Sequence, residues 1–264
     1  MCRLEIGCVL VLSIWAGCGP AGPREVLEAP QGFPESFSGR RLYHTPQAYI
    51  YAHSDTAAGD ADRWVIDAKS YIKSRYKGEL AKGVVIVMEP EDPPLARTVD
   101  EQISYERDPA IMRTQPRKMK TAEEIRTKLN EDGIPELPAV RSNPIPLTAQ
   151  RLQALGLAVP DSPWAVAVPS HQLALNCAVE VGAPAFRKKA PKLTEEQSRK
   201  VAEMAKGTLS KAIEISIPMT VFELWVQSQS SMSDEQRRAA IHRCIPHFCH
   251  ANGLPAPPEE EIDW

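Results

Sequence analysis

One apolar run constrains the fold more than any other feature of the sequence. Gly83–Met88 reads GVVIVM, a stretch without polar side chains in which four of the six residues are β-branched. A short continuous run of this composition predicts a strand that is buried on both faces of its sheet. The acidic and proline-rich segment 89–94 then ends the strand. The chain therefore needs a sheet that other elements cover.

Two more strands and several helices complete this architecture. Apolar and aromatic residues predict strands at 49–52 and 163–169. Helical periodicity and capping residues predict helices at 56–76, 121–132, 148–155, 170–181, 194 to just before Pro218, 222–226, and from 233 until Pro246 kinks or ends the helix. We therefore predict an α+β or α/β fold, with a small mixed sheet of about three strands covered by helices and a helix-rich C-terminal half.

The charge balance argues against a nucleic-acid partner. The 264 residues carry a net charge of −3 and have a pI of about 6.1, whereas nucleic-acid-binding domains usually present a basic face. Hydrophobic residues make up 43% and charged residues 25%, which is ordinary for a folded chain. We therefore expect most of the chain to fold and expect no nucleic acid among its partners.

Residues 1–17 have the layout of a secretory signal peptide. A short polar start with Arg3 precedes an apolar run from Ile6 to Trp15, and small residues follow it. The run is too short for a transmembrane helix, which needs roughly 20 apolar residues. A buried N-terminal strand or helix is the alternative, but small residues and a proline directly after the run favour a cleavage site.

The end of this segment, Ile14-Trp15-Ala16-Gly17-Cys18, resembles the lipobox of bacterial lipoprotein precursors. In that family the cysteine becomes the lipidated first residue of the mature protein, so the resemblance implies lipidation of Cys18. Trp15 stands where the family usually has an aliphatic residue, and cleavage without lipid is the alternative. The resemblance implies an exported protein that a lipid holds on the cell membrane or the outer membrane. It covers only the first eighteen residues, and no family is recognised for the rest.

The rest of the chain divides by composition. We predict a Pro/Gly-rich tether at 18–48, a globular domain at 49–253 with a candidate sub-boundary near 134–147, and a flexible tail at 254–264. An ordered but irregular arm, anchored on the domain by Phe33 and Phe37, is the alternative for the tether.

The densest group of reactive side chains lies near the C-terminus. It contains His242, Cys244, His247, Cys249 and His250, which are residue types that bind metals. At about 100° per residue, however, His242 and Cys249 lie on one helix face, and Cys244 and His247 lie roughly opposite. Only a helix break near the intervening proline would let these side chains converge. We keep the five as weak metal candidates and predict no metal site and no cofactor.

Disulfide formation is the simpler role for the cysteines of an exported chain. If Cys18 is lipidated, then Cys177, Cys244 and Cys249 remain, and three cysteines cannot all pair within one chain. A Cys244–Cys249 bridge again needs the helix to open, because the two Cα atoms must approach within about 7 Å. Cys177 could pair with either of the others, or lie buried as a small apolar residue.

Familiar catalytic motifs are absent from the sequence, including the zincin H-E-x-x-H and the G-x-S-x-G elbow. Ser170 is explained as a helix cap, and pairing it with His171 as nucleophile and base would need a third group. We therefore predict a non-catalytic interaction or structural role in the cell envelope, with the membrane and an envelope protein as partners. The alternative is an exported hydrolase, metal-dependent or not, that uses the cluster at 242–250 together with His171.

Overall fold

The computed structural model describes residues 24–25, 29–95, 98–106, 121–157 and 162–256. Within these ranges the chain forms one mixed sheet of seven strands in the order β1-β3-β4-β5-β7-β6, with β2 paired to β3. The strands are β1 (Arg24–Glu25), β2 (Ser36–Phe37), β3 (Arg40–His44), β4 (Ala48–Ala52), β5 (Gly83–Met88), β6 (Ile145–Pro146) and β7 (Ala165–Pro169). β4, β5 and β7 are parallel to one another, and the other pairings are antiparallel.

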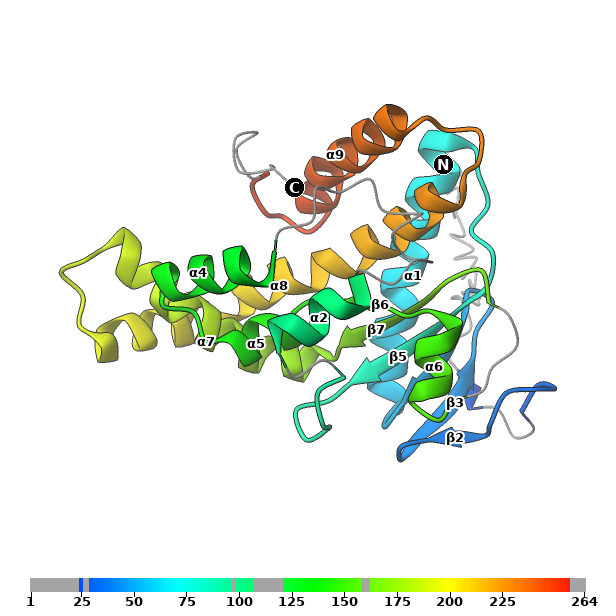
Figure 1. Ribbon diagram of the computed structural model, residues 1–264, viewed down its shortest axis with the longest axis horizontal. Helices are drawn as coiled ribbons and strands as arrows, with labels where there is room; N and C mark the ends of the chain where they lie inside the picture. The colour runs from blue at the N-terminus through cyan, green and yellow to red at the C-terminus, as the bar shows by residue number, and fades with distance from the viewer. Residues whose placement is uncertain (1–23, 26–28, 96–97, 107–120, 158–161, 257–264) are drawn as a thin grey trace, which may run out of the picture.

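Helices cover both faces of this sheet (Figure 1). Their bounds are α1 (Asp55–Tyr76), α2 (Val99–Glu106), α4 (Ala122–Asp132), α5 (Glu136–Arg141), α6 (Ala149–Ala154), α7 (His171–Lys189), α8 (Glu195–Ser228) and α9 (Asp234–Ala251). α7 and α8 pair as a long hairpin that extends away from the sheet, with α4 beside it (Figure 1). The mixed sheet, its helical cover and the helix-rich C-terminal half confirm the predicted class of fold.

The central strand β5 has the predicted burial on both faces, since all six of its residues are buried. Val85 and Val87 pack into a core with α1, α8 and α9. Val84, Ile86 and Met88 pack into a second core, which includes residues of α2, α5, α6 and α7. A strand of alternating polarity could serve only one of these cores, so the unbroken apolar run is what allows the sheet to separate two layers of helices.

The sheet is larger than the predicted three strands, because strands also form in the segment expected to be a tether. β3 pairs along β4, and Leu42 and Tyr43 are buried on opposite faces. Phe37 in β2 is buried and Phe33 packs on Tyr49, with ring centroids 4.2 Å apart. The alternative of an arm anchored by these two phenylalanines is therefore closer to the structure than a free tether, and the folded part begins before residue 49.

Three prolines lie inside helices, and at two of them, Pro218 and Pro246, the sequence predicted an end or a kink. α7 continues past Val181 through Pro184, α8 contains Pro218, and α9 contains Pro246. An internal proline costs a helix about 3 kcal/mol, because one backbone hydrogen bond is lost and the ring crowds the preceding turn. Packing offsets this cost: the two segments predicted around Pro218 form one helix, whose buried residues include Pro218 itself.

None of the helices in the described ranges combines the length and the apolar character that a membrane span needs. The segment 1–17 and Cys18 lie outside the described residues. Most of the predicted tail, from residue 257, also lies outside them.

Candidate functional site

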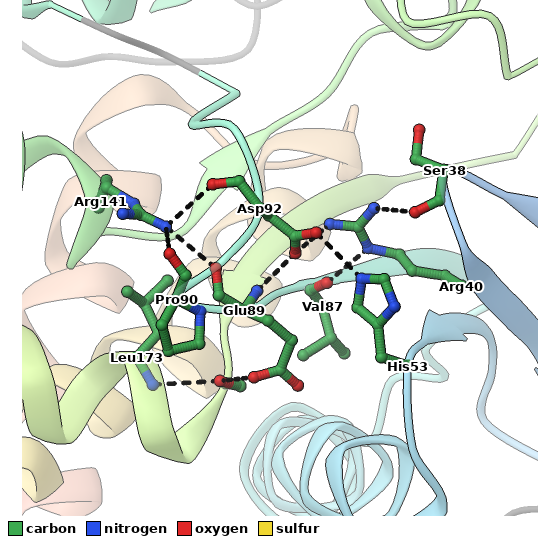
Figure 2. Close-up of polar contacts among 10 residues, drawn as sticks. Ser38, Arg40, His53, Val87, Glu89, Pro90, Asp92, Arg141 and Leu173 are labelled. Atoms are coloured by element: carbon green, nitrogen blue, oxygen red, sulfur yellow. Dashed lines mark hydrogen bonds and ion pairs between the residues drawn. The ribbon is translucent and has the colours of Figure 1, made fainter.

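The carboxyl ends of the three parallel strands bring a row of polar side chains to one edge of the sheet. His53 follows β4, Glu89 and Asp92 follow β5, and Ser170 and His171 follow β7. Ligands of α/β proteins usually bind at this edge. The cluster in Figure 2 is therefore the first place to look for function, and we call it the carboxyl-edge cluster. Its members are Arg40, His53, Glu89, Asp92, Arg141 and Ser170.

The carboxylate of Asp92 lies at the centre of this cluster (Figure 2). Its Oδ2 accepts a hydrogen bond of 2.6 Å from the backbone N–H of Glu89 and forms an ion pair with Arg40. Its Oδ1 lies 3.0 Å from Nε2 of His53. A single side chain therefore connects the turn after β5 to β3 and to the end of β4.

Arg40 contributes a buried positive charge to the cluster. Its side chain is only 4% exposed, and Asp92 is 10% exposed. Nε of Arg40 donates a hydrogen bond of 2.7 Å to the carbonyl oxygen of Val87, in the last part of β5. Burial lowers the pKa of the Arg40 guanidinium, and the nearby carboxylates of Asp92 and Glu89 oppose that shift. The charge is tolerated here because it is both paired and hydrogen-bonded.

Arg141, at the end of α5, holds the same turn from the other side. Its Nη2 donates to three backbone carbonyls: Glu89 and Pro90 at 3.0 Å each, and Asp92 at 3.2 Å. These contacts join residues about fifty positions apart in the chain, and they fix the turn against the helical layer (Figure 2). The turn after β5 is therefore held by one arginine from a strand and another from a helix.

Ser170 is the N-cap of α7, as predicted, and its hydroxyl has a second contact. Its Oγ accepts from the backbone N–H of Leu173 at 3.1 Å and donates to Oε2 of Glu89 at 2.5 Å. His171 pairs instead with Glu214 of α8, with Nδ1 and Oε1 2.6 Å apart. The serine thus hydrogen-bonds to a carboxylate rather than to the histidine, and it is 3% exposed. This arrangement caps a helix and positions a turn, and it lacks the exposed nucleophile and aligned base of covalent catalysis.

The predicted metal candidates near the C-terminus do not converge. Cys244 and Cys249 are buried in the core, whereas His242, His247 and His250 are exposed. The helix continues through Pro246, so the break that convergence required does not occur. No group of three or more His, Cys, Asp or Glu side chains in the described ranges could hold a metal ion.

In the described part of the chain, none of the three disulfide candidates Cys177, Cys244 and Cys249 forms a disulfide, and all three are buried. Because α9 does not open, the stated condition for a Cys244–Cys249 bridge is not met. Burial raises the pKa of the Cys177 and Cys249 thiols, which reduces their thiolate content and hence their reactivity. Cys177 therefore lies on the buried face of α7 as a small apolar residue, which is the second of the two alternatives given for it.

Sequence reasoning found Ser170 and His171 but missed the arginines and Asp92. The turn after β5 was interpreted only as the end of a strand. One signal was present: acidic residues directly after the most buried strand belong at the carboxyl edge, where α/β proteins place polar groups. Arg40 and Arg141 carried no such signal, because their contacts with the turn span 47 to 52 positions of sequence.

In comparison with known proteins, the chain matches no family model, and no significant similarity links it to a curated protein or to a solved structure. The function must therefore be inferred from the residues themselves.

Proposed function

We propose that the protein is an exported lipoprotein of the bacterial cell envelope, and that its folded domain has a non-catalytic, binding role. One observation carries the second part. At the edge of the sheet where an enzyme of this class presents its reactive groups, the carboxylates and the serine hydroxyl form hydrogen bonds within the protein's own turn and helix cap, and His53 lies against Asp92. Catalysis needs groups that interact with the substrate, and such groups must be accessible.

The alternative of a metal-dependent hydrolase lacks support in the described residues. Its proposed ligands lie on different sides of α9. The histidine that would assist them, His171 at the start of α7, is paired with Glu214 of α8. A catalytic zinc requires three protein ligands that converge on one point. We therefore do not retain this alternative.

A lipid on Cys18 would hold the folded domain close to the membrane. β1 begins at Arg24, six residues after Cys18. Each residue spans at most about 3.6 Å, so this stretch reaches roughly 20 Å when fully extended. A partner of the domain would then lie at or near the same membrane surface, which agrees with a role in the envelope.

The anchor is tested by the intact mass of the protein recovered from membranes of an expressing bacterium. We expect a chain that begins at Cys18 and carries acyl groups, and we expect the Cys18→Ser variant to lack both the acyl mass and the membrane association. A wild-type chain that retains residues 1–17, or that is cleaved without gaining lipid, would contradict the anchor.

The binding role is tested separately by assays of hydrolysis. The wild-type protein should not turn over p-nitrophenyl esters, p-nitrophenyl phosphate or a casein substrate above the background rate. Turnover that is lost in Ser170→Ala or His171→Ala, while circular dichroism shows the fold intact, would contradict a non-catalytic role. An activity that survives both substitutions would also contradict it and would direct the search to other residues.

A further inference from the structure

Lysines gather at the edge of the sheet opposite the carboxyl-edge cluster. Between positions 68 and 88 the sequence has five basic residues and one acidic residue, Glu79, although the whole chain has a net charge of −3. α1 begins after β4 and returns to the start of β5, so its last turns and the loop after it lie at or beyond the amino ends of the parallel strands (Figure 1). Four of the basic residues form what we call the lysine face: Lys69, Lys73, Lys77 and Lys82.

Three of these lysines lie in a row. Lys69, Lys73 and Lys77 follow one another at intervals of four residues, a spacing that places side chains next to each other along a helix. Lys73 and Lys77 are exposed, and Lys69 is half-buried. Like charges at this spacing weaken a helix slightly. The helix dipole favours basic residues in a last turn, but Lys69 lies about two turns before the end of α1 and needs another explanation.

Contacts with the beginning of β4 place Lys69 and Lys82 at this edge. Nζ of Lys69 donates a hydrogen bond of 2.7 Å to Oε1 of Gln47, which precedes β4. Nζ of Lys82, the residue before β5, lies 4.5 Å from the ring centroid of Tyr49 in β4. Burial lowers the pKa of Lys82, the nearby carboxylate of Asp62 opposes this shift, and the charge of Lys69 adds to it. Lys69 and Lys82 are therefore close enough to repel each other, and an anionic partner would compensate both charges.

The chain enters the fold beside the lysine face. Arg24 of β1 pairs with His44, at the end of the sheet where β3 finishes and β4 begins. The ring of His44 stacks on that of Tyr49, with centroids 5.2 Å apart. Cys18 precedes Arg24 by six residues, so a lipid on Cys18 would be attached within roughly 20 Å of this edge. The lipid and the lysine face would thus reach the same membrane surface.

We propose that the lysine face lies against a membrane surface that contains anionic phospholipids, and that it orients the domain with the turn of the α7–α8 hairpin away from the membrane (Figure 1). Each lysine close to an anionic bilayer strengthens binding about fivefold. A lipid chain together with a basic patch is one of the combinations that attach a protein stably. The orientation rests on the lipid anchor of the proposed function, whereas the attraction of the lysines to anionic lipid does not.

Lipid vesicles test the lysine face without the anchor. The full-length Cys18→Ser chain, which cannot be acylated at that position, is sedimented with vesicles of phosphatidylcholine alone, or of phosphatidylcholine and phosphatidylglycerol in equal parts. We expect binding at least about tenfold tighter to the anionic vesicles, and we expect added salt to reduce this preference. Residues 1–17 are present in every variant, so their own contribution to vesicle binding cancels in the comparisons.

Matched substitutions then locate the face. Lys73→Gln combined with Lys77→Gln should weaken binding to anionic vesicles at least about tenfold, because two lysines are lost. Lys189→Gln combined with Lys192→Gln removes the same charge beside the turn of the hairpin and should change binding by less than about twofold. All four positions are exposed, so both variants should fold, which circular dichroism verifies.

Acetylation of lysines gives a second measurement on the chain without these substitutions. When the Cys18→Ser chain is bound to anionic vesicles, a water-soluble acetylating reagent should modify Lys73 and Lys77 at least about fivefold more slowly than in the free protein. Lys189 and Lys192 should react at the same rate in both states. Mass spectrometry of the peptides measures each position, and neither of the two lipids carries an amine that would consume the reagent.

Several results would overturn the proposal. Equal binding to the two kinds of vesicle would refute it, as would equal effects of the two double substitutions or equal protection of all four lysines. Failure of the anchor is distinguishable from these results. If the intact mass shows no acyl group but the vesicles give the expected differences, the anchor and the orientation that depends on it are refuted, and the affinity of the lysine face for anionic lipid is established. If the acyl group is present but the vesicles show no preference, the lysine face is refuted and the anchor stands.

Discussion

The carboxyl-edge cluster and the cavity between the helices are built in opposite ways. In the cluster, charged and polar side chains hold a single turn through closely spaced contacts, and Arg40 and Ser170 among them are buried. In the cavity, which residues of α2, α4, α5, α8 and α9 line, the side chains of the described residues are mostly apolar and leave about 270 Å³ unfilled. The first region has many reactive groups and little freedom, and the second has space and few reactive groups.

The difference shows that position in a fold does not by itself identify a site. The carboxyl ends of parallel strands are where α/β proteins usually bind ligands. In this chain that edge carries two arginines that clamp the turn after β5, so its polar groups act mainly on the protein itself. Binding capacity is then expected where the packing is incomplete, among the helices.

The largest effect is expected from removing the buried charge of the cluster. Arg40→Ala would leave Asp92 buried without its cation and the carbonyl of Val87 without its donor. Breaking a buried pair in this way costs about 3–5 kcal/mol of unfolding free energy. Urea unfolding of the two proteins measures the loss.

Arg41→Ala is the matched control for this experiment. Arg41 is the next residue of β3, its side chain is 46% exposed, and it pairs with an 80% exposed Asp55. An exposed pair contributes about 0–1 kcal/mol. A similar loss of unfolding free energy in Arg40→Ala and Arg41→Ala would contradict the contrast drawn here, because the contacts of the cluster would then contribute no more than an exposed ion pair.

A smaller loss is expected from Ser170→Ala. The substitution removes the cap of α7 and the hydrogen bond to Glu89, and the serine is buried. Loss of an N-cap costs about 1 kcal/mol, and we expect about 2 kcal/mol here because the partly buried carboxylate of Glu89 also loses its donor. Ser233→Ala, at the exposed cap of α9, should cost about 1 kcal/mol in the same urea experiment. Equal costs would show that the contact between Ser170 and Glu89 contributes nothing.

The same two regions explain how much of the fold the sequence could predict. The strands 49–52, 83–88 and 163–169 were predicted because burial on both faces leaves a continuous apolar pattern. β3 was missed because Arg40 and Arg41 give its start the composition of a loop, although Arg40 is buried. A buried arginine is explained only by its distant partner, and local sequence does not reveal that partner.

In the helical half, the errors come from proline. Pro218 and Pro246 favoured a helix end or kink in the sequence, but α8 and α9 each continue through their proline, as α7 does through Pro184. The caps were predicted more reliably: Thr121, Thr194 and Ser233 all form capping boxes. A cap acts within four residues, whereas the effect of a proline depends on what the helix packs against. The cavity was likewise beyond prediction, since it results from how five helices meet.

A gain in stability is expected in the helical half. Gly207 is exposed within α8, and a β-carbon added there meets no atom within 4 Å. Gly207→Ala should therefore raise the unfolding free energy by about 0.5–1 kcal/mol, because alanine restricts the unfolded chain and favours the helix. At Gly182 of α7 the same addition lies 2.5 Å from Cδ1 of Leu209, so Gly182→Ala should gain less or lose stability in urea unfolding. The reverse order of the two variants would show that the hairpin is packed differently from this description.

The smallest effect concerns His247, which the sequence placed among the metal candidates. Its ring packs on Tyr71, with centroids 4.4 Å apart, and burial together with the nearby Arg75 lowers its pKa below the ordinary 6.5. The unfolded chain therefore binds a proton more readily than the folded protein as the pH falls below about 6.5, and stability decreases in that range. His247→Phe keeps a ring against Tyr71 but cannot take up the proton, so the decrease in unfolding free energy between about pH 7.5 and 5.5 should be smaller in this variant.

His242→Phe is the matched control, because it adds the same ring at another exposed position of α9. If the His247→Phe and wild-type proteins lose stability equally on acidification, folding does not lower the pKa of His247. Zinc titration provides a second measurement. A rise in melting temperature that is complete at one zinc ion per chain, lost in His247→Phe but kept in His242→Phe, would mean that His247 is a ligand after all. Without that rise, the histidines at the sheet edge and the histidine of α9 have distinct structural roles. His53 and His171 pair with carboxylates at the sheet edge, and His247 packs on the core.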